Sequence, residues 1–179
     1  MSEKIVLLSG APRKEGNTER LITAFIEGAE SAGKNVLELR VADMQIGACR
    51  GCGHCMEEKG VCIQKDDMPG ILAELKKADA VVFASPVYYF NVSAQLKLAI
   101  DRTFALIEVG TTIKRAALLM TSGDESPDIA AAAVIMYENM CGFSGWEKAG
   151  VVLAGGLHEP GEIDGRSELE DARALGYGL

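Results

Sequence analysis

The sequence alternates short apolar segments with amphipathic helical segments along its length, and this alternation restricts the fold more than any other feature. The apolar segments are residues 5–8 (IVLL), 36–39 (VLEL), 80–85 (AVVFAS), 116–121 (AALLMT) and 151–155 (VVLAG). Most are nearly continuous apolar runs, as expected for parallel strands covered by helices on both faces, whereas residues 36–39 alternate like an edge strand. The pattern predicts an α/β fold, a doubly wound five-stranded parallel sheet with strand order 2-1-3-4-5.

Five helices are expected to connect and follow these strands. Their predicted ranges are residues 17–32, 66–77 and 93–107, a helix opened by Ser126 and Pro127, and a helix that ends near Gly176. Asp66 is the expected N-cap of the second helix, and Ser167 with Glu170 forms a predicted capping box for the last one. The third helix should bury Leu96, Ile100 and Phe104, which recur at helical spacing.

Charge and composition exclude several classes of partner. The chain has 26 acidic and 18 basic residues, and its net charge of -8 would repel the phosphates of a nucleic acid. No apolar stretch approaches the roughly 20 residues that span a bilayer, so no membrane partner is expected. The apolar run near the N-terminus is too short for a signal-peptide core, which predicts a cytoplasmic location.

Without repeats or linker-like tracts, residues 1–179 are expected to form one domain.

The loop after the first strand has the composition of a phosphate-binding loop. Residues 9–18 (SGAPRKEGNT) combine small residues, hydroxyls and two cations, and they lead into the N-terminus of a predicted helix. Small residues let backbone N–H groups approach an anion, and the hydroxyls of Ser9 and Thr18 could donate to it. The GxGxxG and GxxxxGK[ST] patterns are both absent, which disfavours a dinucleotide site and a P-loop. The alternative is a capped turn in which Arg13 and Lys14 are solvated.

The loop after the third strand concentrates aromatic residues. Tyr88, Tyr89 and Phe90 are consecutive in a chain that is only 6% aromatic. One of these rings could stack on a flat heteroaromatic ligand while backbone groups pair with its polar edge. Alternatively, the rings cover the ends of helices. Strand order 2-1-3-4-5 places this loop beside the 9–18 loop, at the switch point where ligands bind in open α/β sheets.

These segments together resemble the NADPH-dependent FMN reductase branch of the flavodoxin-like superfamily. The resemblance is carried by SGAPRKEGNT, by KDDMPGI at 65–71, by ADAVVFASPVYYFNVSAQLKLAIDR at 78–102, and by MTSG at 120–123. It implies a flavodoxin-like fold, FMN as cofactor, NAD(P)H as electron donor, and a homodimer or homotetramer. The cofactor-binding residues implied are Ser9, Pro12, Arg13, Asn17 and Thr18 around the phosphate, Pro86, Val87, Tyr88, Tyr89, Phe90 and Asn91 along the isoalloxazine, and Ser122, Gly123 and Asp124 on its other side.

Four of the five cysteines lie in one short segment. Cys49, Cys52 and Cys55 have the C-x2-C-x2-C spacing of ferredoxin-like sites, and Cys62 follows after six residues. This spacing narrows the resemblance to the iron-sulfur flavoprotein subgroup and implies a 4Fe-4S cluster held by the four thiolates. This cysteine spacing is less typical of a zinc site than of an iron-sulfur cluster. Reduced thiols without a metal, or a redox-active pair, remain alternatives.

Three functions follow from these patterns. The first is an FMN-dependent oxidoreductase that takes hydride from NAD(P)H and passes electrons to a small-molecule or protein acceptor. The second is an electron carrier that links FMN, a cluster and a ferredoxin-type donor. The third is a metal- or redox-sensing module in which FMN is incidental. No acid-base or nucleophilic catalytic residue is expected, and His158 could either approach the flavin edge or be structural.

Overall fold

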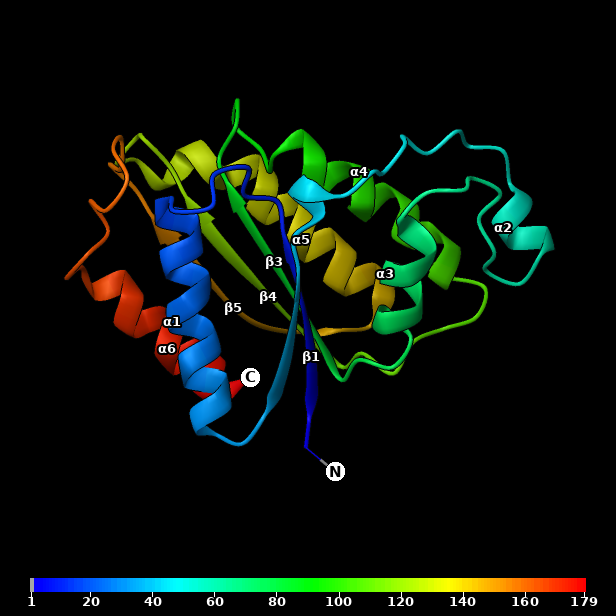
Figure 1. The fold of residues 1–179 in the computed structure, drawn as a ribbon, viewed down its shortest axis with the longest axis horizontal. Helices are drawn as coiled ribbons and strands as arrows, with labels where there is room; N and C mark the ends of the chain where they lie inside the picture. The colour runs from blue at the N-terminus through cyan, green and yellow to red at the C-terminus, as the bar shows by residue number, and fades with distance from the viewer. Residues whose placement is uncertain (1) are drawn as a thin grey trace.

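Five parallel strands form the centre of the computed structural model, which describes residues 2–179 (Figure 1). The strands are β1 (Lys4–Ser9), β2 (Asn35–Leu39), β3 (Ala80–Pro86), β4 (Arg115–Thr121) and β5 (Glu147–Ala154). Their order is β2-β1-β3-β4-β5, so the predicted doubly wound topology is confirmed. The strand predicted to be an edge, β2, is an edge strand, and β1 and β3 flank the switch point.

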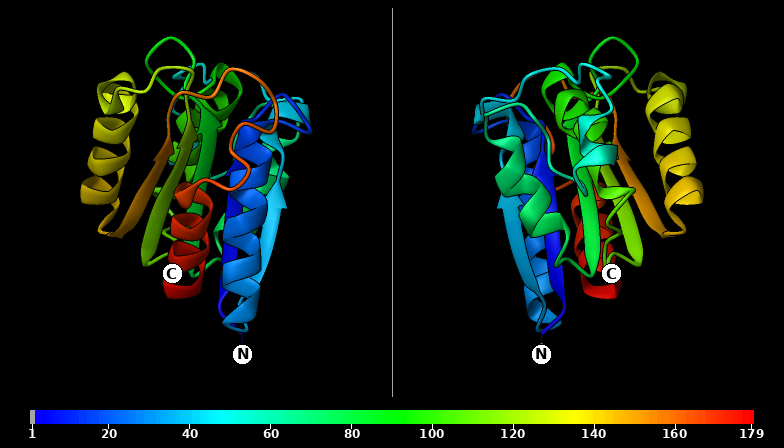
Figure 2. Two further views of the ribbon diagram at one scale, coloured as in Figure 1. Left: turned by 90° about the vertical axis from the view of Figure 1, so that its left-hand side faces the viewer. Right: turned by 90° about the vertical axis from the view of Figure 1, so that its right-hand side faces the viewer.

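Helices cover both faces of the sheet (Figures 1 and 2). One face carries α1 (Asn17–Ser31) and α6 (Ser167–Gly178), and the other carries α3 (Met68–Leu75), α4 (Ala94–Arg102) and α5 (Ala131–Ser144). Shorter elements are α2 (His54–Glu57) and the 3-10 turns η1 (Val41–Asp43), η2 (Thr103–Leu106) and η3 (Pro127–Ala130). No helix in residues 2–179 has the length and apolar character needed to cross a bilayer.

Burial on both faces explains why each central strand has an uninterrupted run of apolar residues in its middle. In β1, Ile5 and Leu7 enter the core under α1 and α6, while Val6 and Leu8 enter the core under α3, α4 and α5. All four side chains are fully buried. A strand buried on both faces loses the polar-apolar alternation of a half-exposed strand, which is the pattern the sequence shows.

Helices α1 and α6 pack so closely that their backbones touch (Figure 2). A Cβ atom at Gly28 of α1 would lie 2.0 Å from the carbonyl oxygen of Arg173. A Cβ atom at Gly176 of α6 would lie 2.1 Å from the carbonyl oxygen of Phe25. Glycine is therefore required on both sides of this contact. The contact fixes α1, whose N-terminus faces the carboxyl edge of the sheet.

Helix α4 is shorter than the sequence predicted. The 93–107 helix ends at Arg102 and continues as the 3-10 turn η2. Leu96 and Ile100 are buried as expected, but the expectation for Phe104 was wrong, because its side chain is half exposed. A 3-10 turn has three residues per turn, so Phe104 leaves the face that the α-helical period assigned to it.

Two predicted helix starts also differ from the structure. Helix α6 begins at Ser167 itself, with Arg166 as N-cap, so the predicted Ser167–Glu170 capping box does not form. The Ser167 hydroxyl lies one position too far into the helix and donates to Glu168 instead. Helix α3 has Asp67 at its N-cap position, although the Asp66 carboxylate accepts a hydrogen bond from the Met68 amide at 3.1 Å.

We predict that Gly28→Ala lowers the free energy of unfolding by at least about 2 kcal/mol, because neither backbone can move aside without separating α1 from α6. Urea denaturation of the two proteins measures this difference. Gly142→Ala in α5 is the matched control, because a Cβ atom there meets nothing within 4 Å. That variant should be neutral or gain up to about 1 kcal/mol from helix propensity. Equal effects of the two substitutions would contradict the backbone contact.

Candidate functional site

A pocket opens at the carboxyl edge of the sheet, where the loops after β1, β3, β4 and β5 meet. Most of the predicted cofactor-binding residues line it, together with residues that the sequence did not single out. The lining consists of Ala11, Pro12, Arg13, Gly16, Asn17, Thr18, Pro86, Val87, Tyr88, Thr121, Ser122, Gly123, Leu157, His158 and Pro160. The pocket therefore lies at the switch point at which the topology places a ligand.

The loops after β1 and β3 are joined at their bases by Gly10 and Ser93. The Gly10 amide donates to the Ala84 carbonyl at 2.8 Å, and the Ser93 hydroxyl donates to the Gly10 carbonyl at 2.7 Å. The Ser93 amide in turn donates to the Ser85 hydroxyl at 2.8 Å. A Cβ atom at Gly10 would lie 2.5 Å from the Ser93 oxygen, so only glycine fits there. The two loops are held in one arrangement relative to each other.

The entry into α1 has the features of an anion site. The N-cap residue is Gly16, which has no side chain to satisfy the first helical amides. The first intrahelical bond there runs from the Arg20 amide to the Gly16 carbonyl, which leaves the preceding amides without helical partners. The exposed Arg13 side chain lines the same pocket and has no ion-pair partner among residues 2–179. Free amides, a helix dipole and a cation together favour a phosphate.

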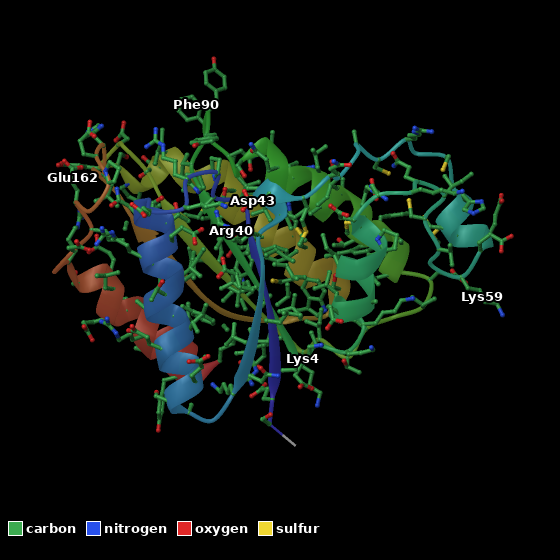
Figure 3. All side chains as sticks on the ribbon, in the orientation of Figure 1. Lys4, Arg40, Asp43, Lys59, Phe90 and Glu162 are labelled. Carbon is green, nitrogen blue, oxygen red and sulfur yellow. The ribbon has the colours of Figure 1, made fainter. Side chains whose placement is uncertain are left out.

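Ser9 lies beneath this loop and is not among the residues that line the pocket. Its side chain is fully buried, and its hydroxyl donates to the Glu19 carboxylate at 3.1 Å. Glu19 also forms an ion pair with Arg40, whose guanidinium reaches Asp43 at 3.0 Å (Figure 3). Ser9 therefore supports the loop from below in this arrangement, which differs from the direct phosphate contact that the resemblance implied.

Asn17 and Thr18 line the pocket and also hold its other walls in place. The Asn17 side-chain oxygen accepts from the Gly161 amide at 2.9 Å, and its side-chain nitrogen donates to the Glu159 carbonyl at 2.9 Å. The hydroxyls of Thr18 and Thr121 lie 2.6 Å apart. The N-terminus of α1 is thus connected to the loops that follow β4 and β5.

The aromatic loop places one of its three rings at the pocket. Tyr88 lines the pocket, whereas Tyr89 and Phe90 form the tip of the turn and do not line it. Phe90 projects away from the sheet (Figure 3). Tyr89 is 95% exposed, and its ring meets that of Phe90 edge-to-face at a centroid distance of 5.5 Å. Asn91 closes the turn through backbone hydrogen bonds with Tyr88. The sequence placed this loop correctly but could not say which ring turns inward.

The tip of the aromatic loop has a strained backbone. Tyr89 and Phe90 have φ angles of 47° and 71°, in the left-handed region that bulky residues rarely adopt. Two consecutive residues of this kind define a tight turn in which glycine or asparagine is the usual choice. Strain of this type concentrates at ligand sites and interfaces. The turn therefore keeps two large rings exposed at an energetic cost.

The remaining wall comes from the loops after β4 and β5. Ser122 and Gly123 line the pocket as expected, whereas Asp124 does not and instead accepts a hydrogen bond from the Ser126 amide. His158 lies against Gly123, where a Cβ atom would be 3.3 Å from the imidazole Nδ1. Leu157 and Pro160 were missed from the sequence, although loops after central strands all meet at this edge.

Glu162 holds the loop that carries His158. Its carboxylate accepts hydrogen bonds from the backbone amides of His158 at 2.6 Å and Glu159 at 3.0 Å (Figure 3). The Glu159 and His158 amides hold the pKa of Glu162 below its usual range. Glu162 is therefore ionised at neutral pH and keeps the His158 backbone close to the pocket.

The four clustered cysteines lie outside this pocket, in an irregular excursion of residues 47–66 that we call the cysteine segment. It extends away from the sheet and contains α2, with Lys59 near its tip (Figures 1 and 3). Cys49 and Cys52 are exposed, Cys55 and Cys62 are half-buried, and all are free thiols.

Within residues 2–179, no three cysteine, histidine or acidic side chains converge on one point. Burial, followed by the proximity of Cys62, Cys49 and Cys52, raises the pKa of the Cys55 thiol.

The two ends of the cysteine segment are fastened together. The Asp66 carboxylate accepts from the Gly47 amide at 3.0 Å, and the Gln64 side chain donates to the Ala48 carbonyl at 3.0 Å. Just outside the segment, the Asp67 carboxylate accepts from the Gln45 amide at 2.7 Å. The segment is therefore a loop with a closed base, and Cys49 and Cys62 lie close to that base in the sequence.

Comparison with known proteins assigns the chain to a family. Residues 3–140 match the family model of the NADPH-dependent FMN reductases. The chain belongs to this family. An iron-sulfur flavoprotein of Archaeoglobus fulgidus is 42% identical over 99 residues, covering 55% of this chain and 44% of that protein. A second one from the same organism is 32% identical over 139 residues, covering 75% of this chain and 67% of the relative.

The match to such relatives is partial in length. The chain spans 44%, 51% and 53% of three iron-sulfur flavoproteins that it matches, from Archaeoglobus fulgidus, Methanocaldococcus jannaschii and Methanosarcina thermophila. Activities of the complete relatives therefore apply to this chain only as proposals.

Solved structures of the same fold cover nearly the whole chain. The NAD(P)H:quinone oxidoreductase from Methanothermobacter marburgensis superposes with a TM-score of 0.79 at 22% identity, covering 99% of this chain and 96% of that one. An FMN-dependent NADH-azoreductase from Bacillus anthracis, solved in complex with FMN, gives a TM-score of 0.73 at 17% identity, with coverage of 97% and 98%. At these identities the likeness shows the shared fold.

We predict that Ser93→Ala lowers the free energy of unfolding by about 2 kcal/mol, because it removes an N-cap and leaves the Gly10 carbonyl without its donor. Thermal or urea denaturation measures the loss. Ser126→Ala is the matched control, since Ser126 caps the exposed turn η3 and supports no second loop. That control should cost less than about 1 kcal/mol. A Ser93 effect no larger than the control would contradict the coupling of the two loops.

Proposed function

We propose that this chain binds FMN in the pocket at the switch point and acts as an NAD(P)H-dependent oxidoreductase. The observation that carries the proposal is that one pocket combines a helix N-terminus, the exposed Arg13 side chain and the aromatic side chain of Tyr88. Membership in the NADPH-dependent FMN reductase family supports it. The residues present fit the cofactor, because one end of the pocket suits a phosphate and the other suits a flat ring.

The phosphate end is formed by Pro12, Arg13 and the first turn of α1. Arg13 would pair with the phosphate, and the amides around Asn17 and Thr18 would donate to it. Ser9 would act through Glu19 and Arg40, which fix the loop from below. This division explains why the loop exposes the Arg13 cation at the surface while Glu19 and Arg40 form an ion pair underneath.

The ring end is formed by the loops after β3 and β4. Pro86, Val87 and Tyr88 would contact the isoalloxazine from one side, and Ser122, Gly123 and His158 from the other. Asn91 and Asp124 shape their turns through backbone hydrogen bonds. When bound, FMN accepts hydride from a reduced nicotinamide and transfers electrons to an acceptor. The protein binds and orients the cofactor and needs no acid-base residue of its own.

The projecting rings of Tyr89 and Phe90 are proposed to meet a second copy of the chain in a homodimer or homotetramer. They are exposed, apolar and held in a strained turn directly beside the pocket. A neighbouring subunit would cover them and close the flavin site. The electron acceptor is proposed to be a small molecule or a redox protein that approaches the same edge.

Replacement of Arg13 tests the phosphate end. Arg13→Gln should raise the Kd for FMN about 10- to 100-fold, the cost of one charge-assisted hydrogen bond. The Kd for riboflavin, which lacks the phosphate, should not change. Fluorescence titration with both flavins measures the two constants.

Lys14→Gln is the matched control for this titration. Lys14 is the adjacent cation, its side chain is 77% exposed, and it does not line the pocket. Its replacement should change FMN affinity by less than about threefold, as expected for a screened surface charge. An equal loss of FMN and riboflavin affinity in Arg13→Gln would contradict the assigned phosphate contact.

An electron carrier with an iron-sulfur cluster is the second candidate function. The favourable observation is the cysteine segment, in which four free thiols share one loop with a closed base. The donor set fits a 4Fe-4S cluster, which takes four thiolates. Because the sulfurs do not converge on one point among the described residues, we expect the segment to tighten when it binds the cluster.

Anaerobic stopped-flow mixing separates the two functions. We expect NADPH or NADH to bleach the flavin absorbance of the FMN-loaded protein in a phase whose rate depends on nicotinamide concentration. Bleaching by a reduced ferredoxin, with no bleaching by either nicotinamide, would contradict the reductase function and favour the carrier.

A further inference from the structure

Arg102 is a buried cation at the C-terminus of α4. The residue is 3% exposed, and its side chain is 1% exposed. Removing a guanidinium from water is costly unless its charge and its donors are satisfied. No residue of the pocket at the switch point contacts it, so the flavin site does not explain its position.

The guanidinium of Arg102 contacts the cysteine segment at three points. It forms an ion pair with the Asp66 carboxylate, and the same nitrogen donates to the Gly47 carbonyl at 3.2 Å. Its other terminal nitrogen donates to the Sγ atom of Cys62 at 3.3 Å. The Arg102 Nε atom is buried and has no hydrogen-bond partner among residues 2–179. Arg102 therefore brings the two ends of the segment together around one thiol.

The contact with Cys62 is chemically specific. A neutral thiol is a weak hydrogen-bond acceptor, whereas a thiolate is an anion that pairs well with a guanidinium. Asp66 alone could neutralise Arg102, yet one terminal nitrogen is directed at sulfur. The arrangement suits a sulfur that carries negative charge, as a metal-bound thiolate does.

Cys62 differs from the other three clustered cysteines in this respect. Cys49 and Cys52 are exposed, and Cys55 packs partly against the apolar core. The stretch between them contains left-handed residues at Gly51 and Gly53, where the chain turns freely. Cys62 is thus the clustered thiol that a buried cation of the fold holds by a hydrogen bond, and the other three lie on the loop that could close toward it.

Helix α4 connects this thiol to the flavin site. Its N-cap, Ser93, holds the loops after β1 and β3, and its last residue, Arg102, holds Cys62. The helix has nine residues and is therefore about 14 Å long. One rigid element thus sets the distance between the proposed flavin and the cysteine segment.

We propose that Arg102 is a positioning residue that fixes Cys62 and stabilises the negative charge of an iron-sulfur site built on it. This inference rests on the second function proposed above and goes beyond it by assigning a residue outside the four cysteines. Hydrogen bonds to cluster sulfurs and nearby positive charge raise the reduction potential of a cluster. Arg102 supplies a hydrogen bond and a positive charge at Cys62, one of the proposed cluster ligands. The negative charge of Asp66 acts in the opposite direction and lowers the reduction potential.

The test compares the wild-type chain of residues 1–179 with Arg102→Gln, Asp66→Asn and Lys97→Gln, all purified without air. Iron and sulfide per chain are measured, and the midpoint potential of the cluster is obtained by redox titration followed by electron paramagnetic resonance. Arg102→Gln removes a positive charge and should shift the potential to a lower value. Asp66→Asn removes a negative charge while leaving the Arg102 contact with Cys62, and it should shift the potential to a higher value.

Lys97→Gln is the matched control on the same helix. Lys97 is exposed, forms an ion pair with Asp101, and carries the same charge as Arg102. Its replacement should leave the potential and the iron content unchanged. Arg102→Lys, which keeps the charge without the planar donor, should restore part of the wild-type potential. A merely structural role would lower iron content in the Arg102 and Asp66 variants without moving their potentials in opposite directions.

Several outcomes would overturn the inference. These are a wild-type chain that binds no iron, an unchanged potential in Arg102→Gln, and an equal shift in Lys97→Gln. FMN binding is titrated on the same samples, so a chain that binds FMN but no iron overturns this inference and leaves the flavin function intact. Should Arg102→Gln fail to fold, an Asp66→Asn potential equal to or below the wild-type value also overturns it.

Discussion

The hydrogen bond from the Ser93 hydroxyl to the Gly10 carbonyl joins the two loops on which the pocket depends. It can form only because residue 10 has no side chain, which lets the start of α4 approach the β1 loop. Through Gly10 this bond fixes the approach to the α1 N-terminus. A separate bond, from the Ser93 amide to the Ser85 hydroxyl, ties the same residue to the aromatic loop. This contact brings the β1 loop and the aromatic loop to one pocket, although they lie about 70 residues apart in the chain and share no local structure.

The sheet and the position of the pocket could be predicted because both depend on local patterns and topology. Continuous apolar runs identified the central strands, and strand order then located the switch point between the 9–18 loop and the aromatic loop. Details set by tertiary contacts could not be predicted. The direction of Ser9 depends on Glu19 and Arg40, and the inward turn of Tyr88 depends on the strained residues that follow it. His158 reaches the pocket through Glu162, a contact that no spacing in the sequence indicates.

In the cysteine segment, too, the sequence predicts the chemistry of the side chains but not the contacts that position them. The spacing of its cysteines predicts an iron-sulfur cluster motif from the sequence alone. The attachment of this segment to the fold depends on Arg102, which lies 40 residues after Cys62. In the sequence, Arg102 is only the last residue of a segment that resembles the family. A buried arginine beside a thiol is a long-range pairing, so periodicity and composition carry no signal of it. Helix α4 joins the two regions that we propose to be redox-active, because its N-cap Ser93 lies at the pocket and its last residue Arg102 lies at the cysteine segment.

Hydrogen-deuterium exchange with and without saturating FMN tests the central claim, that the flavin binds at the switch point. The account predicts slower exchange in the peptides that contain residues 10–18, 86–91, 121–123 and 157–160, where the pocket lining lies. Peptides of β2, α3 and α5 should exchange at the same rate in both states. Slower exchange confined to other regions, or no change on FMN addition, would contradict the account.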